Sequence, residues 1–353
     1  MPPSERVATP RPSPRRWPRR LRRAGGCVGI GLLLLLVGGT LANAGLERAA
    51  RVPPPGRLVA VGDHRLHIHC VGTGGPAVVL EAGAGSSSLL LTRLQRALAS
   101  SVRACVYDRA GLGWSEAGDG RYDIATASSE LHLLLRASEV PLPVVLVGHS
   151  LGANIAAHYA AAHPEDLAGV VLVDPGVPED MLEDFRGTET EALAIDDCGW
   201  KCGAGAAAAR TGLVRLAMRM AGAGSKTLTP AENARYRAEM SRPSSLRAAV
   251  GSLVFLPKSA LQARDARGFG DVPVTVVYSG DTRKPEGDET PADVARWHAR
   301  TLERMRELAA GSSRGRGPVV VPGATHVSVV TQPAGIGAIV AETLRLAGLS
   351  PAL

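Results

Sequence analysis

The sequence lacks a glycine-rich phosphate-binding loop of the required form, and it contains no internal repeat. The missing loop argues against a nucleotide-binding protein that uses such a loop, and the missing repeat argues against a repeat architecture. Cysteine is also scarce, with five residues in 353. Cys198 and Cys202 lie close together, but no histidine or third cysteine is near them. Because a structural zinc site needs four ligands, the sequence predicts no metal site there.

Residues 24–353 carry no net charge. The formal charge is +7, and residues 1–23, with eight arginines and one glutamate, carry all of it. We therefore expect residues 1–23 to form a disordered basic tail in the cytoplasm. A neutral remainder argues against a nucleic-acid partner.

No charged residue occurs in the 23 residues from Ala24 to Leu46, which include a run of five leucines. This length is enough for a transmembrane helix. Because the arginines precede it, we expect a single-pass anchor in the cell membrane, with the following domain outside the cytoplasm. The site Ala42-Asn43-Ala44 also fits a signal peptidase, so the alternative is a secreted protein cleaved near Ala44. Residues 47–56 then form a linker.

The cysteines are compatible with an exported domain. Cys27 falls in the charge-free segment, and we expect Cys70 and Cys105 to be buried apolar residues on strands. Cys198 and Cys202 are close enough in sequence for a local disulfide in an oxidising compartment, a pairing that the sequence leaves open.

Short aliphatic runs alternate with helical patterns along the chain, which predicts an α/β fold with a doubly wound, mostly parallel sheet. On the second strand, His67 and His69 alternate and are expected to face solvent. The predicted strands are Arg57–Val61, Arg65–Val71, Ala77–Leu80, Val102–Tyr107, 143–147, Leu167–Val173, Val272–Tyr278 and Val319–Val321.

The alternation pauses over residues 176–267, where the pattern is helical. A capping box at Thr229–Glu232 predicts a helix that ends at Met240. We expect this segment to be a helical cap over the carboxyl edge of the sheet, with 57–175 and 268–353 as the core.

The stretch Gly148-His149-Ser150-Leu151-Gly152 follows a buried strand and precedes a small-residue helix. Strand, Gly-x-Ser-x-Gly and helix are the layout of a nucleophile elbow, in which a tight turn raises the serine hydroxyl. The flanking glycines remove side chains that would collide at this turn. Ser150 is therefore the predicted nucleophile.

A serine nucleophile needs a base and an acid that orients the base, and in this architecture they follow in the order acid, histidine. Of four later histidines, His158 and His163 lie on or just after the elbow helix and His298 lies mid-helix. His326 falls in a loop after the last strand and is the predicted base. The predicted acid is Asp281, with Asp174 and Asp288 as alternatives. We assign Asp108, before the nucleophile, to its own glycine-rich loop.

Two backbone N–H groups should stabilise the oxyanion. One belongs to Leu151, directly after the nucleophile, and the other to the loop after the third strand. In that loop, Ala84 lies between two glycines that leave its N–H accessible, so Ala84 is the predicted second donor.

These residues resemble the α/β-hydrolase superfamily, in its serine-nucleophile branch. The resemblance extends from Arg57 to Leu346 and is carried by Glu81-Ala-Gly-Ala-Gly85, Tyr107-Asp-Arg-Ala-Gly-Leu-Gly-Trp-Ser115, Gly148–Gly152 and Gly323-Ala-Thr-His326 with Gln332-Pro333. It implies a Ser-His-acid triad, an acyl-enzyme intermediate and no cofactor.

The chain departs from that family at two places. Many members have His-Gly where this chain has Ala82-Gly83, and the acid often follows the strand-end glycine by two or three residues, whereas Asp281 follows Gly280 directly. Serine at position 150 argues against the haloalkane dehalogenase and epoxide hydrolase branches, which use aspartate there.

The sequence thus predicts a serine hydrolase that cleaves an ester-type acyl bond of a small-molecule or lipid-like substrate. The alternatives are a peptidase, amidase, lactonase or acyltransferase with the same triad, or a catalytically silent binding module on the membrane surface. The sequence does not determine the oligomeric state.

Overall fold

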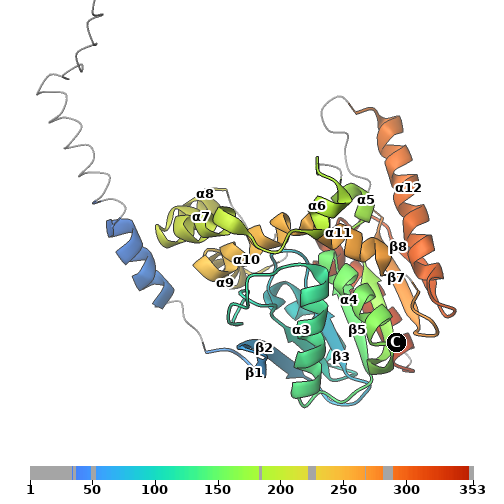
Figure 1. The fold of residues 1–353 in the computed structure, drawn as a ribbon. Coiled ribbons are helices and arrows are strands. Elements are labelled where there is room, and N and C mark those ends of the chain that lie inside the picture. Colours follow the sequence, from blue (N-terminus) through green and yellow to red (C-terminus); the bar gives the residue numbers. More distant parts are fainter. Residues whose placement is uncertain are drawn as a thin grey trace, which may run out of the picture.

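The computed structural model describes residues 34, 37–48, 53–182, 185–221, 228–266, 268–280 and 289–349. An eight-stranded sheet with the order β1-β2-β4-β3-β5-β6-β7-β8 forms its centre (Figure 1). The strands are β1 (Arg57–Val61), β2 (His64–Val71), β3 (Val78–Glu81), β4 (Ala104–Tyr107), β5 (Val144–His149), β6 (Leu167–Val173), β7 (Val274–Ser279) and β8 (Arg316–Val321).

Pairing in the sheet is mostly parallel, as predicted. Strands β1 and β2 form an antiparallel hairpin, and β2 also pairs antiparallel with β4. All pairs from β4 to β8 are parallel. The predicted α/β fold with a doubly wound sheet is thus confirmed.

Helices cover both faces of the sheet because successive strand residues point to opposite sides. In β5, Val144 and Leu146 join one apolar cluster with α3, α4 and α12, whereas Val145 and Val147 join a second with α2 and α14. The helices of the core are α2 (Thr92–Leu98), α3 (Ile124–Ala137), α4 (Leu151–Ala162), α12 (Pro291–Ala310), α13 (Ser328–Thr331) and α14 (Pro333–Leu346), with the 3-10 turns η1 (Ser88–Leu91) and η2 (Pro164–Asp166).

Seven described helices lie between β6 and β7. The capping box of Thr229 and Glu232 opens α9, which ends at Met240 as predicted. These helices, which we call the helical insertion, are α5 (Pro178–Met181), α6 (Glu189–Leu193), α7 (Gly199–Arg210), α8 (Leu213–Met220), α9 (Pro230–Met240), α10 (Pro243–Val254) and α11 (Leu256–Asp265).

Helix α10 of the insertion packs directly on two loops at the carboxyl edge of the sheet. A Cβ atom added at Gly85 would lie 3.1 Å from the side chain of Ala249, and one at Gly111 would lie 3.1 Å from that of Ala248. The glycines after β3 and β4 therefore allow α10 to approach their backbone.

Two expectations for the second strand are wrong. His67 is fully buried, because Asp108 and the carbonyl of Pro55 bind its two ring nitrogens; His69 is partly buried. Cys70 and Cys105 form a disulfide between β2 and β4, since the register of the two strands places them opposite each other. The pairing of Cys198 with Cys202, which the sequence left open, is present.

A helix over residues 37–48 packs against the helical insertion. The side-chain amide of Asn43 donates to the carbonyl of Ala209 at 3.1 Å and accepts from Arg215 at 3.0 Å. Most of the predicted membrane segment, namely residues 24–33, 35 and 36, lies outside the described residues, as do Cys27 and the basic tail. Within the described ranges, no helix has both the length and the apolar character of a membrane span.

Candidate active site

The turn at Ser150 has the geometry of a nucleophile elbow. Ser150 has φ 57° and ψ −127°, a backbone conformation that costs free energy outside glycine. The two flanking glycines permit it: a Cβ at Gly148 would lie 2.2 Å from the carbonyl oxygen of Gly152, and one at Gly152 would lie 2.5 Å from that of Ala82. Either side chain would force the turn open, so Ser150 stays at the tip.

His326 lies beside Ser150, although 176 positions separate them in sequence. Its Nε2 is 2.9 Å from Ser150 Oγ, which is hydrogen-bond distance. His326 follows β8 in the turn before α13, and its side chain is half exposed. The imidazole can therefore take the hydroxyl proton while remaining open to a substrate.

Asp174 occupies the other side of the imidazole. Its Oδ2 is 2.5 Å from His326 Nδ1, and Asp174 stands directly after β6 with φ 48°. The backbone N–H of Ser279 donates to Oδ1 at 3.1 Å, and the Ser279 hydroxyl donates to Oδ2 at 2.8 Å. Burial alone would raise the pKa of Asp174, but His326 and these two hydrogen bonds lower it below its ordinary value. A carboxylate thus orients the imidazole of His326.

Of the predicted site residues, the structure brings together Ser150, His326 and the alternative acid Asp174. Asp281, which the sequence favoured, and Asp288 lie outside the described residues. The sequence feature that made Asp174 a candidate acid was its position at the end of a predicted strand. His163 and His298 have other partners: His163 stacks on His132 at 3.8 Å between ring centroids, and His298 binds the Tyr278 hydroxyl at 3.1 Å.

The loop of the predicted oxyanion donors packs on the nucleophile. A Cβ at Gly83 would lie only 3.2 Å from Ser150 Cβ, so glycine allows this approach. Ala84 is exposed in the turn closed by a hydrogen bond from Ser86 to Gly83, and Leu151 is the first residue of α4. Among the described residues, neither the N–H of Ala84 nor that of Leu151 has an acceptor, which leaves both free for an oxyanion.

Arg109, for which the sequence predicts no role, anchors this loop through hydrogen bonds. Its guanidinium donates to the buried carboxylate of Glu81 and to the carbonyl oxygens of Ala82 and Gly83. Burial raises the pKa of Glu81 to about 7, against the opposing effect of Arg109. In the sequence, only the position of Arg109 next to Asp108, directly after β4, pointed to a role for Arg109. Asp108 itself binds the N–H of Trp114, as expected of a residue that holds its own loop.

We predict that Arg109→Gln lowers kcat by about 100-fold, because a small displacement of the loop misplaces an oxyanion donor. Arg109→Lys retains the charge, but it loses the planar guanidinium and should lower kcat by about tenfold. Steady-state kinetics with thermal unfolding of each variant measures this. Arg300→Gln, an exposed arginine of α12, is the control. An unchanged kcat in folded Arg109→Gln would contradict the prediction.

His149, between the first glycine and Ser150, ties the elbow to the base. Its Nε2–H donates to the backbone carbonyl of His326 at 2.8 Å, and the two rings lie 4.8 Å apart between centroids. Burial, and then the positive charge of His326, lower the pKa of His149 to about 4. His149 is therefore a neutral positioning residue at physiological pH.

The lowered pKa of His149 makes stability depend on pH. Unfolded chains bind a proton at this residue below the ordinary histidine pKa of 6.5, whereas the folded chain binds it only near 4, so the free energy of unfolding falls as the pH drops through this window. His149→Gln keeps a donor for His326 but cannot titrate. Between neutral pH and pH about 4, we expect the free energy of unfolding to fall less in His149→Gln than in the wild type, by on the order of 3 kcal/mol. Urea unfolding of the two proteins across this pH range measures the difference. Parallel pH curves for the two proteins would contradict this.

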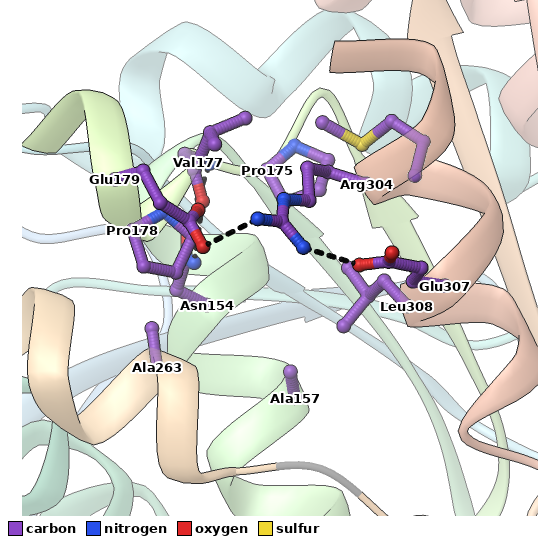
Figure 2. Close-up of a pocket in the computed structure, with 12 residues that line it drawn as sticks. Asn154, Ala157, Pro175, Val177, Pro178, Glu179, Ala263, Arg304, Glu307 and Leu308 are labelled. Atoms are coloured by element: carbon purple, nitrogen blue, oxygen red, sulfur yellow. Dashed lines mark hydrogen bonds and ion pairs between the residues drawn. The ribbon is translucent and has the colours of Figure 1, made fainter. Parts of the chain in front are cut away.

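A small cavity lies beside the strand end that carries Asp174. Figure 2 shows Arg304 between Glu179 and Glu307, and Asn154 also lines the cavity. Its volume of about 40 Å³ is well below the several hundred Å³ of typical ligand sites. Ser150, His326 and Asp174 do not line this cavity.

Comparison with known proteins agrees with the fold. A family model described as alpha/beta hydrolase fold matches residues 76–284, more than half of the chain. The chain therefore belongs to the α/β hydrolase fold family.

The curated relatives match only in part. The uncharacterised protein YqjL of Bacillus subtilis is 34% identical over 122 residues, which are 32% of this chain and 48% of YqjL. The uncharacterised protein Rv2715 of Mycobacterium tuberculosis is 29% identical over 148 residues, or 40% of this chain and 43% of that protein. The matches thus span less than half the length of these relatives.

Solved structures share the fold over most of the chain. The enol-lactonase of Burkholderia xenovorans superposes with a TM-score of 0.55 at 21% identity, over 82% of this chain and 100% of that one. The epoxide hydrolase CorEH gives 0.59 at 18% identity, over 82% and 97%. A putative lipase of Acinetobacter baumannii gives 0.56 at 18% identity, over 85% and 94%. At these identities the likeness concerns the fold.

Proposed function

We propose that this protein is a serine hydrolase that cleaves an ester-type acyl bond through an acyl-enzyme intermediate. The observation that carries the proposal is the continuous contact from Ser150 through His326 to Asp174. A hydroxyl, an imidazole and a buried carboxylate in that order are the groups needed to activate a serine. The acid is thus Asp174 in place of Asp281.

The reaction proceeds in two halves. Ser150 Oγ attacks the carbonyl carbon while its proton passes to His326 Nε2, and the carbonyl oxygen becomes an oxyanion held by the N–H groups of Ala84 and Leu151. Collapse of this intermediate expels the alcohol, which takes the proton from His326. In the second half, water gives a proton to His326 Nε2 and attacks the acyl carbon, which forms a second oxyanion intermediate. Its collapse breaks the bond to Ser150 Oγ, which takes the proton back from His326, and releases the acid.

A fluorophosphonate probe tests the nucleophile, since it forms a covalent adduct only with an activated serine. We expect an adduct on Ser150, located by peptide mass spectrometry, in the folded chain and none in Ser150→Ala. A folded wild-type chain without an adduct would support the alternative of a silent binding module.

The choice of an ester over other acyl bonds needs its own experiment. The neighbours include an enol-lactonase and a deformylase, so lactones and amides belong in the comparison. Rates for p-nitrophenyl esters of increasing chain length, aminoacyl arylamides and simple lactones, each against Ser150→Ala, measure the preference. Faster turnover of arylamides or lactones than of every ester would overturn the ester assignment.

We also propose that residues 24–46 anchor the protein in the cell membrane, with the domain outside the cytoplasm. The uncharged length of this segment supports an anchor. The disulfides Cys70–Cys105 and Cys198–Cys202 support an oxidising compartment. Alkaline extraction of membranes and mass spectrometry of the mature N-terminus test this. A soluble chain that begins at Gly45 would establish the secreted alternative.

A further inference from the structure

Helix α8 of the insertion carries large apolar side chains on its surface. Leu213, Leu216 and Met220 are 60%, 54% and 80% exposed. Their spacing of three and four residues places them on one side of the helix. Side chains of this kind are normally buried, and an exposed row of them indicates a surface that contacts an apolar partner.

The charges on helices α7 and α8 themselves have one sign, whereas Glu47 of the helix 37–48 and Glu232 of the neighbouring α9 are acidic. From Gly199 to Met220, the two helices α7 and α8 contain four basic residues and no acidic one. Arg210 and Arg219 are exposed. An apolar helix face flanked by arginines is typical of helices that lie in the headgroup region of an anionic bilayer. The charge thus favours a lipid surface over a neutral or basic protein.

The helix of residues 37–48 lies directly beside this surface. In addition to the hydrogen bonds of Asn43, its Gly39 approaches the turn between α7 and α8 closely: a Cβ there would lie 2.8 Å from the carbonyl oxygen of Thr211. Val37 and Leu41 on the same helix are 48% and 69% exposed. Figure 1 shows this dark-blue helix next to α7 and α8, at the side of the molecule away from α12. Gly39 and Asn43, which belong to the charge-free segment 24–46, therefore lie against the turn that precedes α8.

We propose that Leu213, Leu216 and Met220, with Arg210 and Arg219, form a lipid-contact surface that lies on an anionic bilayer. This proposal rests on the proposed membrane location and adds to it a second contact, made by the insertion. Residue Gly205 of α7 packs on Val250 of α10, and Ala249 of α10 packs on Gly85. The lipid-contact surface of α8 thus connects through α7 and α10 to the loop beside Ser150, which suits a lipid-like acyl substrate.

Tryptophan fluorescence in vesicles tests the surface with the full chain. Leu216→Trp places a reporter on the lipid-contact surface, and Leu133→Trp places one at a similarly exposed site on α3 (48%) as the control. Both are reconstituted in phosphatidylcholine–phosphatidylglycerol vesicles with brominated acyl chains, and the emission of the unsubstituted chain is subtracted. We expect brominated lipid to lower the added emission of Leu216→Trp about twofold or more, and that of Leu133→Trp by much less. Arg210→Glu with Arg219→Glu should weaken the quenching.

Three outcomes would overturn the proposal. Equal quenching of the two reporters in a chain that sediments with the vesicles would leave the anchor and remove the lipid-contact surface. A chain that does not sediment with vesicles would remove both. A dimer in sedimentation velocity that Leu216→Glu disrupts would assign the surface to a second copy of the chain. Fluorophosphonate labelling of Ser150 in the same samples reports separately on the proposed hydrolase.

Discussion

Replacing Ser150 with alanine is expected to lower kcat by on the order of 10⁶-fold, the size found when a serine nucleophile is removed from other triad hydrolases. The reason is structural. His326 Nε2 lies 2.9 Å from Ser150 Oγ, so without the hydroxyl the base has no group to activate. The variant keeps the oxyanion N–H groups, which alone give only a small residual acceleration over water.

The measurement is ester hydrolysis by Ser150→Ala purified apart from any wild-type enzyme, with active-site titration to detect contamination. Ser129→Ala, an exposed serine on α3, should retain wild-type kcat. Because the hydroxyl and imidazole act together, Ser150→Ala with His326→Ala should be no slower than either single variant. Additive losses in the double variant would contradict a shared step.

The proposed nucleophile and base were predictable because their signals are local. Ser150 stands in a turn between a buried strand and a small-residue helix, and His326 stands in a loop after the last strand. Parallel strands place both loops at one edge of the sheet, so topology alone brings them close. No knowledge of side-chain packing was needed for these two residues.

The remaining residues depend on packing that the sequence does not encode locally. Strands β6 and β7 are neighbours, so Asp174 and Asp281 both follow strands that end at the same edge. What marks Asp174 is its φ of 48° and the two donors of Ser279, which lies 105 residues away, whereas Asp281 lies outside the described residues. The Cys70–Cys105 disulfide likewise depends on the register between β2 and β4.

Asp174→Asn is expected to lower kcat on the order of 10⁴-fold, the size that the same change causes in a Ser-His-Asp protease. In the wild type, Oδ2 of Asp174 accepts the Nδ1–H of His326, which leaves Nε2 free to accept the proton of Ser150. The asparagine oxygen is expected to keep the N–H of Ser279 as its donor, which turns the amide nitrogen toward His326. The imidazole then places its proton on Nε2 and can no longer act as the base.

Asp281→Asn is the matched comparison for Asp174→Asn, because Asp281 was the acid favoured by the sequence. We expect it to retain most of the activity, with both variants assayed on the same ester and their thermal unfolding compared. Some loss of stability is expected for Asp174→Asn alone: the pKa of Asp174 is lowered in the folded chain, so its carboxylate stabilises the fold above its ordinary pKa and loses this effect as the pH falls. A large loss of kcat in Asp281→Asn, with a mild one in Asp174→Asn, would show that the base is oriented by Asp281 during turnover.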